Sequence, residues 1–203
     1  MATIDWVLFD LGGVLLEVVQ PRIFNHLQQL TDIPAATIEQ KMKGASFFRD
    51  HFMVKEFTPS EIAAHVNEVL GQQLSDDDVV AALNAELGAE IATTATLVPT
   101  LQRKTKVGCL SNTNSIHWDK LLSSYAFMQS FDRRFASQIL GCAKPGKEIY
   151  EMVVSNLGAH PREILFFDDK PENVEAAQRL GWHARVYTTH EQLVADLAEL
   201  SLV

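Results

Sequence analysis

The sequence predicts an α/β fold in which helices cover both faces of a parallel sheet and a helical bundle is inserted after the first strand. Beyond about residue 93, short apolar runs alternate with helical patterns, which is typical of a parallel sheet. Residues 21–89, in contrast, carry helical periodicity and no convincing strand. The 203 residues, of which 47% are hydrophobic, suffice for one buried core with an insertion.

The N-terminal part of the chain supplies the first strand and two helices. Residues 4–9, IDWVLF, form a short apolar run that ends at Asp10, which is typical of a buried strand running into a loop. Helical periodicity then predicts one helix near residues 21–30 and a second near 34–43. These two helices begin the inserted segment.

Two further helices of the insertion begin at capping boxes. In Thr58–Glu61 and in Ser75–Asp78, a hydroxyl residue is followed three positions later by an acidic one. Gly71 can end the first of these helices. Apolar periodicity carries the second helix to Leu87, where Gly88 would end it. We therefore expect a helical hairpin or a four-helix bundle.

The rest of the chain alternates between helices and strands. Helices are predicted at 93–104, with a kink or boundary at Pro99, and at 115–124, 147–157, 171–180 and 190–201. Strands are predicted at 106–110, 133–137, 164–167 and 183–187. We expect residues 1–14 and 91–203 to form the core, and residues 15–90 to form an inserted helical cap.

Charge and composition argue against several classes of partner. The formal net charge of −9 disfavours a nucleic-acid backbone or an anionic membrane surface. No stretch reaches the ~18 uninterrupted apolar residues of a membrane span, and the N-terminus lacks the basic region of a signal peptide. The two cysteines, Cys109 and Cys142, cannot build a disulfide framework. We therefore expect a cytoplasmic protein that binds neither nucleic acid nor membranes.

Polar residues collect where the predicted strands end. Asp10 follows the first strand, and Ser111–Asn114 follow the second. Lys144 lies in the loop after the third strand, and Asp168 and Asp169 follow the fourth. Because ligands of open α/β sheets bind outside the carboxyl ends of the strands, we expect these side chains to converge.

Such a set of residues points to phosphate chemistry. Three carboxylates at one place repel each other unless a cation lies among them, and oxygen ligands favour Mg²⁺. Ser111 and the backbone N–H groups after it can hold phosphoryl oxygens, and Lys144 can neutralise developing charge. A carboxylate in line with phosphorus can act as a nucleophile and form an aspartyl-phosphate.

Four short motifs resemble those of the haloacid dehalogenase-like hydrolase superfamily. They are FDLGGV at 9–14, LSNTN at 110–114, AKP around Lys144, and FFDDKPEN at 166–173. Their order and spacing match across nearly the whole chain. The insertion resembles the helical cap of one large branch, and the first motif is similar to that of bacterial sugar-1-phosphate phosphatases. The resemblance implies a Rossmann-like core, a helical cap and Mg²⁺-dependent hydrolysis.

The resemblance also implies the metal ligands. Asp10 would bind Mg²⁺ as well as act as the nucleophile, and the backbone carbonyl of Gly12 would supply another oxygen. Asp169 would ligate Mg²⁺ directly, and Asp168 either directly or through water. Asn173 would take the supporting position of the fourth motif.

The phosphoryl group would be bound by residues of the second and third motifs. Ser111 and the amide of Asn112 would hold its oxygens, and Lys144 would pair with both Asp10 and the phosphate. Arg49, in a bulky aromatic segment of the insertion, is a further candidate for substrate binding, although such a segment is also typical of simple packing.

The first motif departs from the family pattern at Gly12, where phosphatases usually carry a second Asp that serves as general acid and base. Three explanations remain open. In the first, the protein is a phosphatase of a small phosphorylated metabolite. It either acts on a leaving group that needs less help, which favours sugar phosphates because an anomeric oxygen leaves more readily, or it uses another acid. Alternatively it is a 2-haloacid dehalogenase, against which the metal-type pair Asp168 and Asp169 argues, or a catalytically silent binding protein. We expect a monomer or a weak homodimer.

Overall fold

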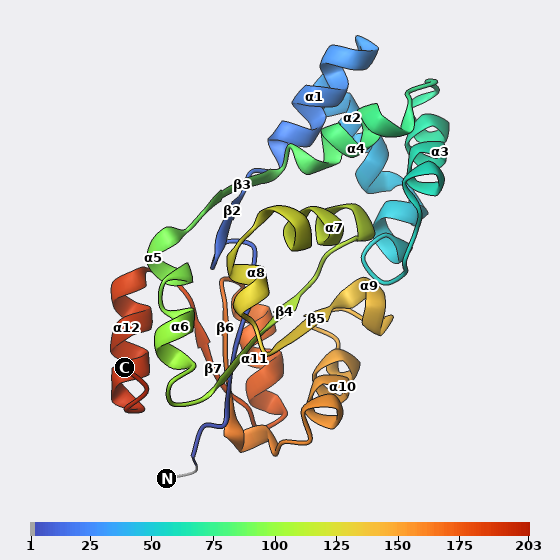
Figure 1. Ribbon diagram of the computed structural model, residues 1–203. Helices are drawn as coiled ribbons and strands as arrows, with labels where there is room; N and C mark the ends of the chain where they lie inside the picture. Colours follow the sequence, from blue (N-terminus) through green and yellow to red (C-terminus); the bar gives the residue numbers. More distant parts are fainter. Residues whose placement is uncertain (1–2) are drawn as a thin grey trace.

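The computed structural model describes residues 3–203, so the first two residues of the predicted core segment 1–14 lie outside it. Its centre is a five-stranded parallel sheet in the order β5-β4-β1-β6-β7, with helices on both faces (Figure 1). The strands are β1 Trp6–Phe9, β4 Lys106–Ser111, β5 Arg133–Ala136, β6 Ile164–Asp168 and β7 His183–Val186. The predicted α/β fold class is confirmed.

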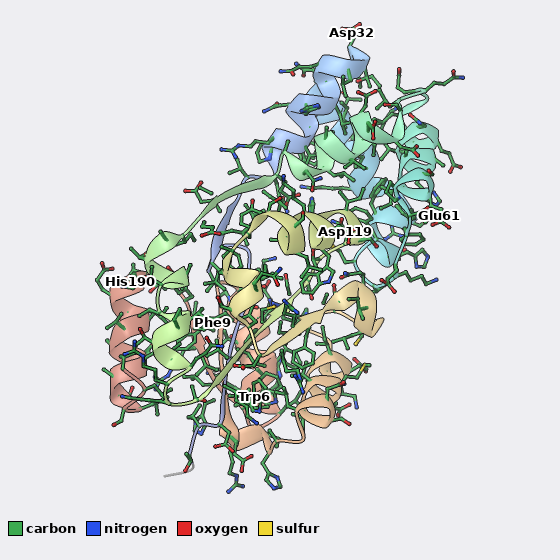
Figure 2. The ribbon with its side chains drawn as sticks, viewed as in Figure 1. Trp6, Phe9, Asp32, Glu61, Asp119 and His190 are labelled. Atoms are coloured by element: carbon green, nitrogen blue, oxygen red, sulfur yellow. The ribbon has the colours of Figure 1, made fainter. Side chains whose placement is uncertain are left out.

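Strand β1 is the middle of the sheet because all of its side chains are apolar and buried. It pairs with β4 on one side and with β6 on the other. Val7 and Phe9 pack into one apolar cluster, whereas Trp6 and Leu8 pack into a second one. Figure 2 shows Trp6 and Phe9 within the sheet region and charged residues such as Asp32 and Glu61 at the periphery. A continuous apolar run is what a strand covered on both faces requires.

The long helices around the sheet lie close to the predicted ranges. They are α7 Ser115–Ser124, α10 Lys147–Leu157, α11 Pro171–Arg179 and α12 His190–Glu199. Short helical turns are α8 Phe127–Ser130, α9 Ser137–Leu140 and the 3₁₀ turn Pro161–Glu163. Within residues 3–203, none of the helices combines the length and the apolar composition needed to cross a bilayer.

The helix predicted at 93–104 is divided in two, and the boundary expected at Pro99 is confirmed. The structure has two short helices there, α5 Ala92–Ala95 and α6 Val98–Leu101. Pro99 lies in the first turn of α6. Its missing N–H and its ring prevent it from continuing a helix that began before it.

Four helices and a π-helical turn form a second packed unit above the sheet (Figure 1). They are α1 Pro21–Thr31, α2 Ala35–Gly44, the π-helical turn Phe47–His51, α3 Pro59–Leu70 and α4 Asp76–Asn84. Both predicted capping boxes are present. These helices share an apolar cluster of their own, which Ile116 of α7 joins. We call residues 21–84 the helical segment.

A two-stranded antiparallel ribbon connects the helical segment to the sheet (Figure 1). Its strands are β2 Leu16–Val18 and β3 Leu87–Glu90. The expectation of a helix reaching Leu87, with no strand before 89, is therefore wrong. Gly88 does not end a helix: a Cβ on it would lie 2.7 Å from the Cβ of Glu17, so glycine allows the strands to approach closely.

Candidate active site

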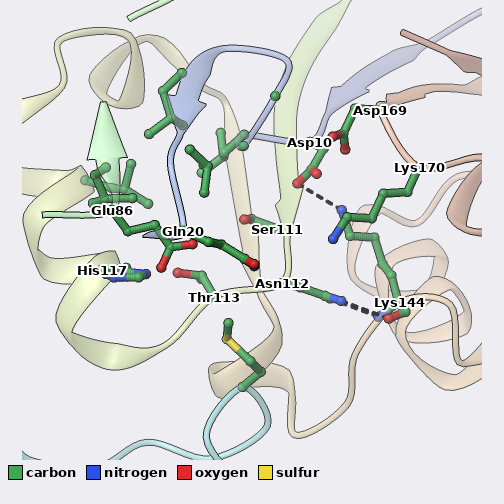
Figure 3. Close-up of a pocket in the computed structure, with 18 of the residues that line it drawn as sticks. Asp10, Gln20, Glu86, Ser111, Asn112, Thr113, His117, Lys144, Asp169 and Lys170 are labelled. Carbon is green, nitrogen blue, oxygen red and sulfur yellow. Dashed lines mark hydrogen bonds and ion pairs between the residues drawn. The ribbon is translucent and has the colours of Figure 1, made fainter. Parts of the chain in front are cut away.

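The predicted polar residues converge at the carboxyl end of the sheet. Asp10 directly follows β1, Ser111 ends β4, and Asp168 ends β6. They lie at or beside a cavity of about 400 Å³ beneath the ribbon (Figure 3). The cavity is lined by residues of the motifs and of the ribbon, among them Asp10, Gly12, Gly13, Val18, Gln20, Met53, Glu86, Ser111, Asn112, Thr113, His117, Lys144, Asp169, Lys170 and Asn173.

Lys144 contacts two of the three carboxylates of the site, those of Asp10 and Asp168. Its Nζ lies 2.9 Å from Asp10 Oδ1 and 2.7 Å from Asp168 Oδ2, and it donates to the carbonyl of Leu110 at 2.8 Å. All three ammonium protons therefore have acceptors. The side chain is 1% exposed. Burial disfavours its charge, but Asp10 and Asp168 outweigh burial and raise the pKa of Lys144, so the ammonium stays charged.

Asp10, Asp168 and Asp169 form a cluster whose ligand oxygens lie within 4.8 Å of one another. Burial raises the pKa of Asp10 to about 6, although Lys144 opposes this. Burial and then the charge of Asp168 raise the pKa of Asp169. One lysine does not balance three carboxylates. The excess negative charge and the all-oxygen donor set fit a hard divalent cation such as Mg²⁺.

The two neighbouring aspartates have different surroundings. Asp168 is fully buried, and its Oδ1 accepts from the backbone N–H of Lys170 and from Asn173 Nδ2, both at 2.9 Å. Its Oδ2 accepts from Lys144 and from Asn173. Asp169 is exposed and lines the cavity. Asp168 is thus held as an acceptor for Lys144, while Asp169 presents oxygens to the cavity, and Asn173 orients Asp168.

Asn112 fixes the loop that carries Lys144. Its Nδ2 donates to the carbonyl of Lys144 at 2.8 Å, and its Oδ1 accepts from the backbone N–H of the same residue at 2.9 Å. Ser111 is buried beside it and reaches the cavity. A single amide therefore joins the loops of the second and third motifs, which lie more than 30 residues apart.

The turn after Asp10 depends on two glycines. Gly13 has a φ of +76°, and a Cβ there would lie 2.5 Å from Asp169 Oδ2. Glycine is needed both for the backbone conformation and for the approach to that carboxylate. A Cβ on Gly12 would lie 2.9 Å from Cγ2 of Val18. Val18 therefore closes the space into which a side chain at position 12 would extend.

Arg49 is not among the residues that line the cavity. Its side chain is 59% exposed, and its guanidinium forms an ion pair with the adjacent Asp50 at 2.8 Å. The lining residues that sequence reasoning missed include Gln20 and Glu86, which flank the ribbon. Their positions in the sequence could have indicated this. They lie at the two ends of the inserted segment, where the chain enters and leaves it, and both ends face the carboxyl edge of the sheet.

His117 lines the cavity but has both ring nitrogens engaged. Its Nδ1 lies 3.0 Å from Asn114 Nδ2, and its Nε2 lies 2.9 Å from the carbonyl of Leu83. These partners require a neutral ring with the proton on Nε2. Burial lowers the pKa of His117, in agreement with the neutral form. The Nε2 hydrogen bond ties α7 to α4 of the helical segment.

Comparison with known proteins agrees with this geometry. The chain is 27% identical to phosphatase MT3486 of Mycobacterium tuberculosis over 99% of its length and 97% of that protein. It is 22% identical to a D-ribitol-5-phosphate phosphatase of Bacteroides thetaiotaomicron, covering 87% and 88% of the two chains. A crystal structure of the enzyme BT-2542 from the same organism, in complex with magnesium and inorganic phosphate, superposes with a TM-score of 0.81 at 29% identity, covering 91% and 94%. Residues 4–181 match the family model of haloacid dehalogenase-like hydrolases, and the chain belongs to that family.

Proposed function

We propose that the protein is a Mg²⁺-dependent phosphatase of small phosphoesters, with sugar and polyol phosphates as the favoured substrates. The observation that carries the proposal is the arrangement of Asp10 against the buried Lys144 and beside Asp169 at the cavity. The similarity to two relatives, a phosphatase and a D-ribitol-5-phosphate phosphatase, supports it. A cavity of about 400 Å³ accommodates a small metabolite.

Asp10 is the proposed nucleophile. With a pKa of about 6, its carboxylate is ionised at neutral pH, and Lys144 holds it in place. In the proposed reaction the carboxylate attacks phosphorus, the bond to the leaving oxygen breaks, and water then attacks the aspartyl-phosphate to release phosphate. Ser111 and the amide of Asn112 are proposed to hold the phosphoryl oxygens while charge builds on them.

The proposed ligands of Mg²⁺ are Asp10, Asp169 and the backbone carbonyl of Gly12, with Asp168 oriented by Asn173 behind them. Bound there, Mg²⁺ would neutralise phosphoryl charge and help align the ester. Asp168 keeps Lys144 charged and directed at Asp10.

The helical segment is the proposed cap, with the domain boundaries at about 15 and 90 in the ribbon. Met53 of this segment and Gln20 at its start line the cavity. Movement of the segment on its two-stranded connection would admit the substrate and then exclude water from the reacting groups. The absence of a side chain at Gly12 favours leaving groups that need little protonation, such as an anomeric oxygen.

The test is phosphate release from hexose 1-phosphates, hexose 6-phosphates, pentitol phosphates and p-nitrophenyl phosphate, with and without Mg²⁺. We expect metal-dependent release, and we expect Asp10→Asn to abolish it. Asp5→Asn is the matched control, because Asp5 is exposed beyond the opposite end of β1. No release by folded wild-type protein would contradict the proposal, and metal-independent chloride release from 2-chloropropionate would replace it with a dehalogenase.

A further inference from the structure

Glu86 is a carboxylate in the cavity to which the proposed reaction gives no role. It lies between the end of α4 and the start of β3. Its backbone N–H donates to the carbonyl of Leu83 at 3.2 Å, and its carbonyl accepts from the N–H of Val19 at 2.9 Å. Figure 3 shows its side chain across the cavity from Asp10 and Asp169. The fold therefore holds a carboxylate where the part of a substrate beyond its phosphate would lie.

The Glu86 carboxylate is half-buried, yet among residues 3–203 it has no hydrogen-bond or ion-pair partner within bonding distance. Two other polar side chains of the lining, in contrast, are paired: Asn112 with the backbone of Lys144, and His117 through both ring nitrogens. Burial raises the pKa of Glu86, and the charge of Lys170 opposes this. A partly desolvated carboxylate without donors is suited to receive them from a ligand.

We propose that Glu86 is a specificity-determining residue that accepts hydrogen bonds from hydroxyl groups of the leaving alcohol and disfavours substrates with a second anionic group. This inference rests on the proposed phosphatase function. A carboxylate can accept from hydroxyls but repels a carboxylate or a second phosphate at the same place. The neighbouring Gln20 amide, which also lines the cavity, can serve a polyol hydroxyl as donor or acceptor.

Lys170 also lines the cavity, and its positive charge acts on Glu86. It lies in the turn after β6, at the start of α11, and is exposed. If Lys170 dominated recognition, the wild type would already prefer the substrate with a second anionic group. Removing the charge of Glu86 would then only strengthen this preference. A comparison of two substrates that differ only in this group therefore separates the contributions of Glu86 and Lys170.

The experiment compares kcat/KM for glycerol 3-phosphate and 3-phosphoglycerate, which carry a hydroxymethyl group and a carboxylate at the same position. We expect the wild type to prefer glycerol 3-phosphate, and we expect Glu86→Gln to lower this preference by about tenfold, as for a hydrogen bond to a charged group. Glu17→Gln is the matched control: Glu17 lies on β2 of the same ribbon, is exposed, and is not part of the lining. It should leave the preference unchanged.

An unchanged preference in Glu86→Gln would overturn the inference, as would a wild-type preference for 3-phosphoglycerate. Where turnover is slow, the same ratio is measured from the inhibition constants of the two compounds against p-nitrophenyl phosphate, and failure of both to compete would also overturn it. If the wild-type protein hydrolyses p-nitrophenyl phosphate in these assays, the proposed phosphatase function stands even when the inference about Glu86 fails. Failure of the inference and failure of the proposed function are therefore distinguishable. Circular dichroism establishes that each variant is folded.

Discussion

Replacing Lys144 with methionine removes the only charge that balances Asp10 and Asp168 within the described ion pairs, while keeping much of the side chain's length. The lysine is 1% exposed and pairs at 2.9 Å and 2.7 Å. Removing one partner of a buried ion pair costs about 3–5 kcal/mol, because the remaining charge stays desolvated. For a chain of this size, such a loss lowers the melting temperature by about 10 °C.

The loss should depend on pH. In Lys144→Met, the pKa of Asp10 in the folded state rises further above its unfolded value, because burial then acts without the opposing lysine. The folded state of the variant takes up a proton as the pH falls, whereas the unfolded state does so only near pH 4. The difference in unfolding free energy between wild type and variant is therefore largest above pH 7 and smaller at pH 5.

The assay is urea unfolding at pH 8 and pH 5 in the presence of a chelator, followed by circular dichroism. Lys147→Met is the control, because Lys147 is exposed and pairs with Glu151 only at 3.5 Å across one helical turn. Its effect should stay within about 0.5 kcal/mol. A Lys144→Met protein as stable as this control at pH 8 would refute the reasoning.

Three further predictions concern neighbouring positions. Gly13→Ala should lower the unfolding free energy by about 1–2 kcal/mol. It should also weaken Mg²⁺ binding in calorimetry, because its Cβ would meet Asp169. The control Gly141→Ala, at a similar φ of +75° with open space around it, should keep the affinity for Mg²⁺. Gly12→Asp should lower the unfolding free energy by about 1 kcal/mol, because its Cβ would meet Cγ2 of the exposed Val18. Adding Val18→Ala should recover at least half of this loss in the same urea assay, and equal losses in both backgrounds would contradict the prediction. Because burial lowers the pKa of His117, unfolded chains bind a proton below about pH 6.5 more readily than the folded state does. Wild type should therefore lose more unfolding free energy than His117→Gln between pH 7.5 and 5.5 in the same urea assay, and equal losses would exclude this role.

The sheet and the motif residues were predictable because their signals are local. The three central strands, β1, β4 and β6, are short and largely apolar runs, and turn-forming or charged residues mark where they end. Once the strands are parallel and adjacent, their carboxyl ends share one edge, so Asp10, Ser111 and Asp168 must come close. Lys144 lies beyond a helical turn after its strand, and the hydrogen bonds from Asn112 that hold its loop were not readable from the sequence.

The ribbon was not predictable because its strands are short and distant in sequence. Leu87 fits the apolar period of the preceding helix, and only pairing with Val18, far earlier in the chain, draws it into β3. The orientation of Glu86 follows from that pairing, so its place in the cavity was equally hidden. Arg49 lies within the π-helical turn Phe47–His51 and pairs with Asp50, a local arrangement that its neighbouring aromatic residues did not indicate.

The central claim is that Asp10 receives a phosphoryl group with the help of Mg²⁺. Beryllofluoride coordinates a carboxylate oxygen in the geometry of an acyl phosphate, so its binding tests this claim without knowledge of the natural substrate. In ¹⁹F NMR we expect bound beryllofluoride resonances in wild-type protein that require Mg²⁺ and that are absent from Asp10→Asn. Resonances of equal intensity in Asp10→Asn, or none in folded wild-type protein at saturating Mg²⁺, would contradict the account.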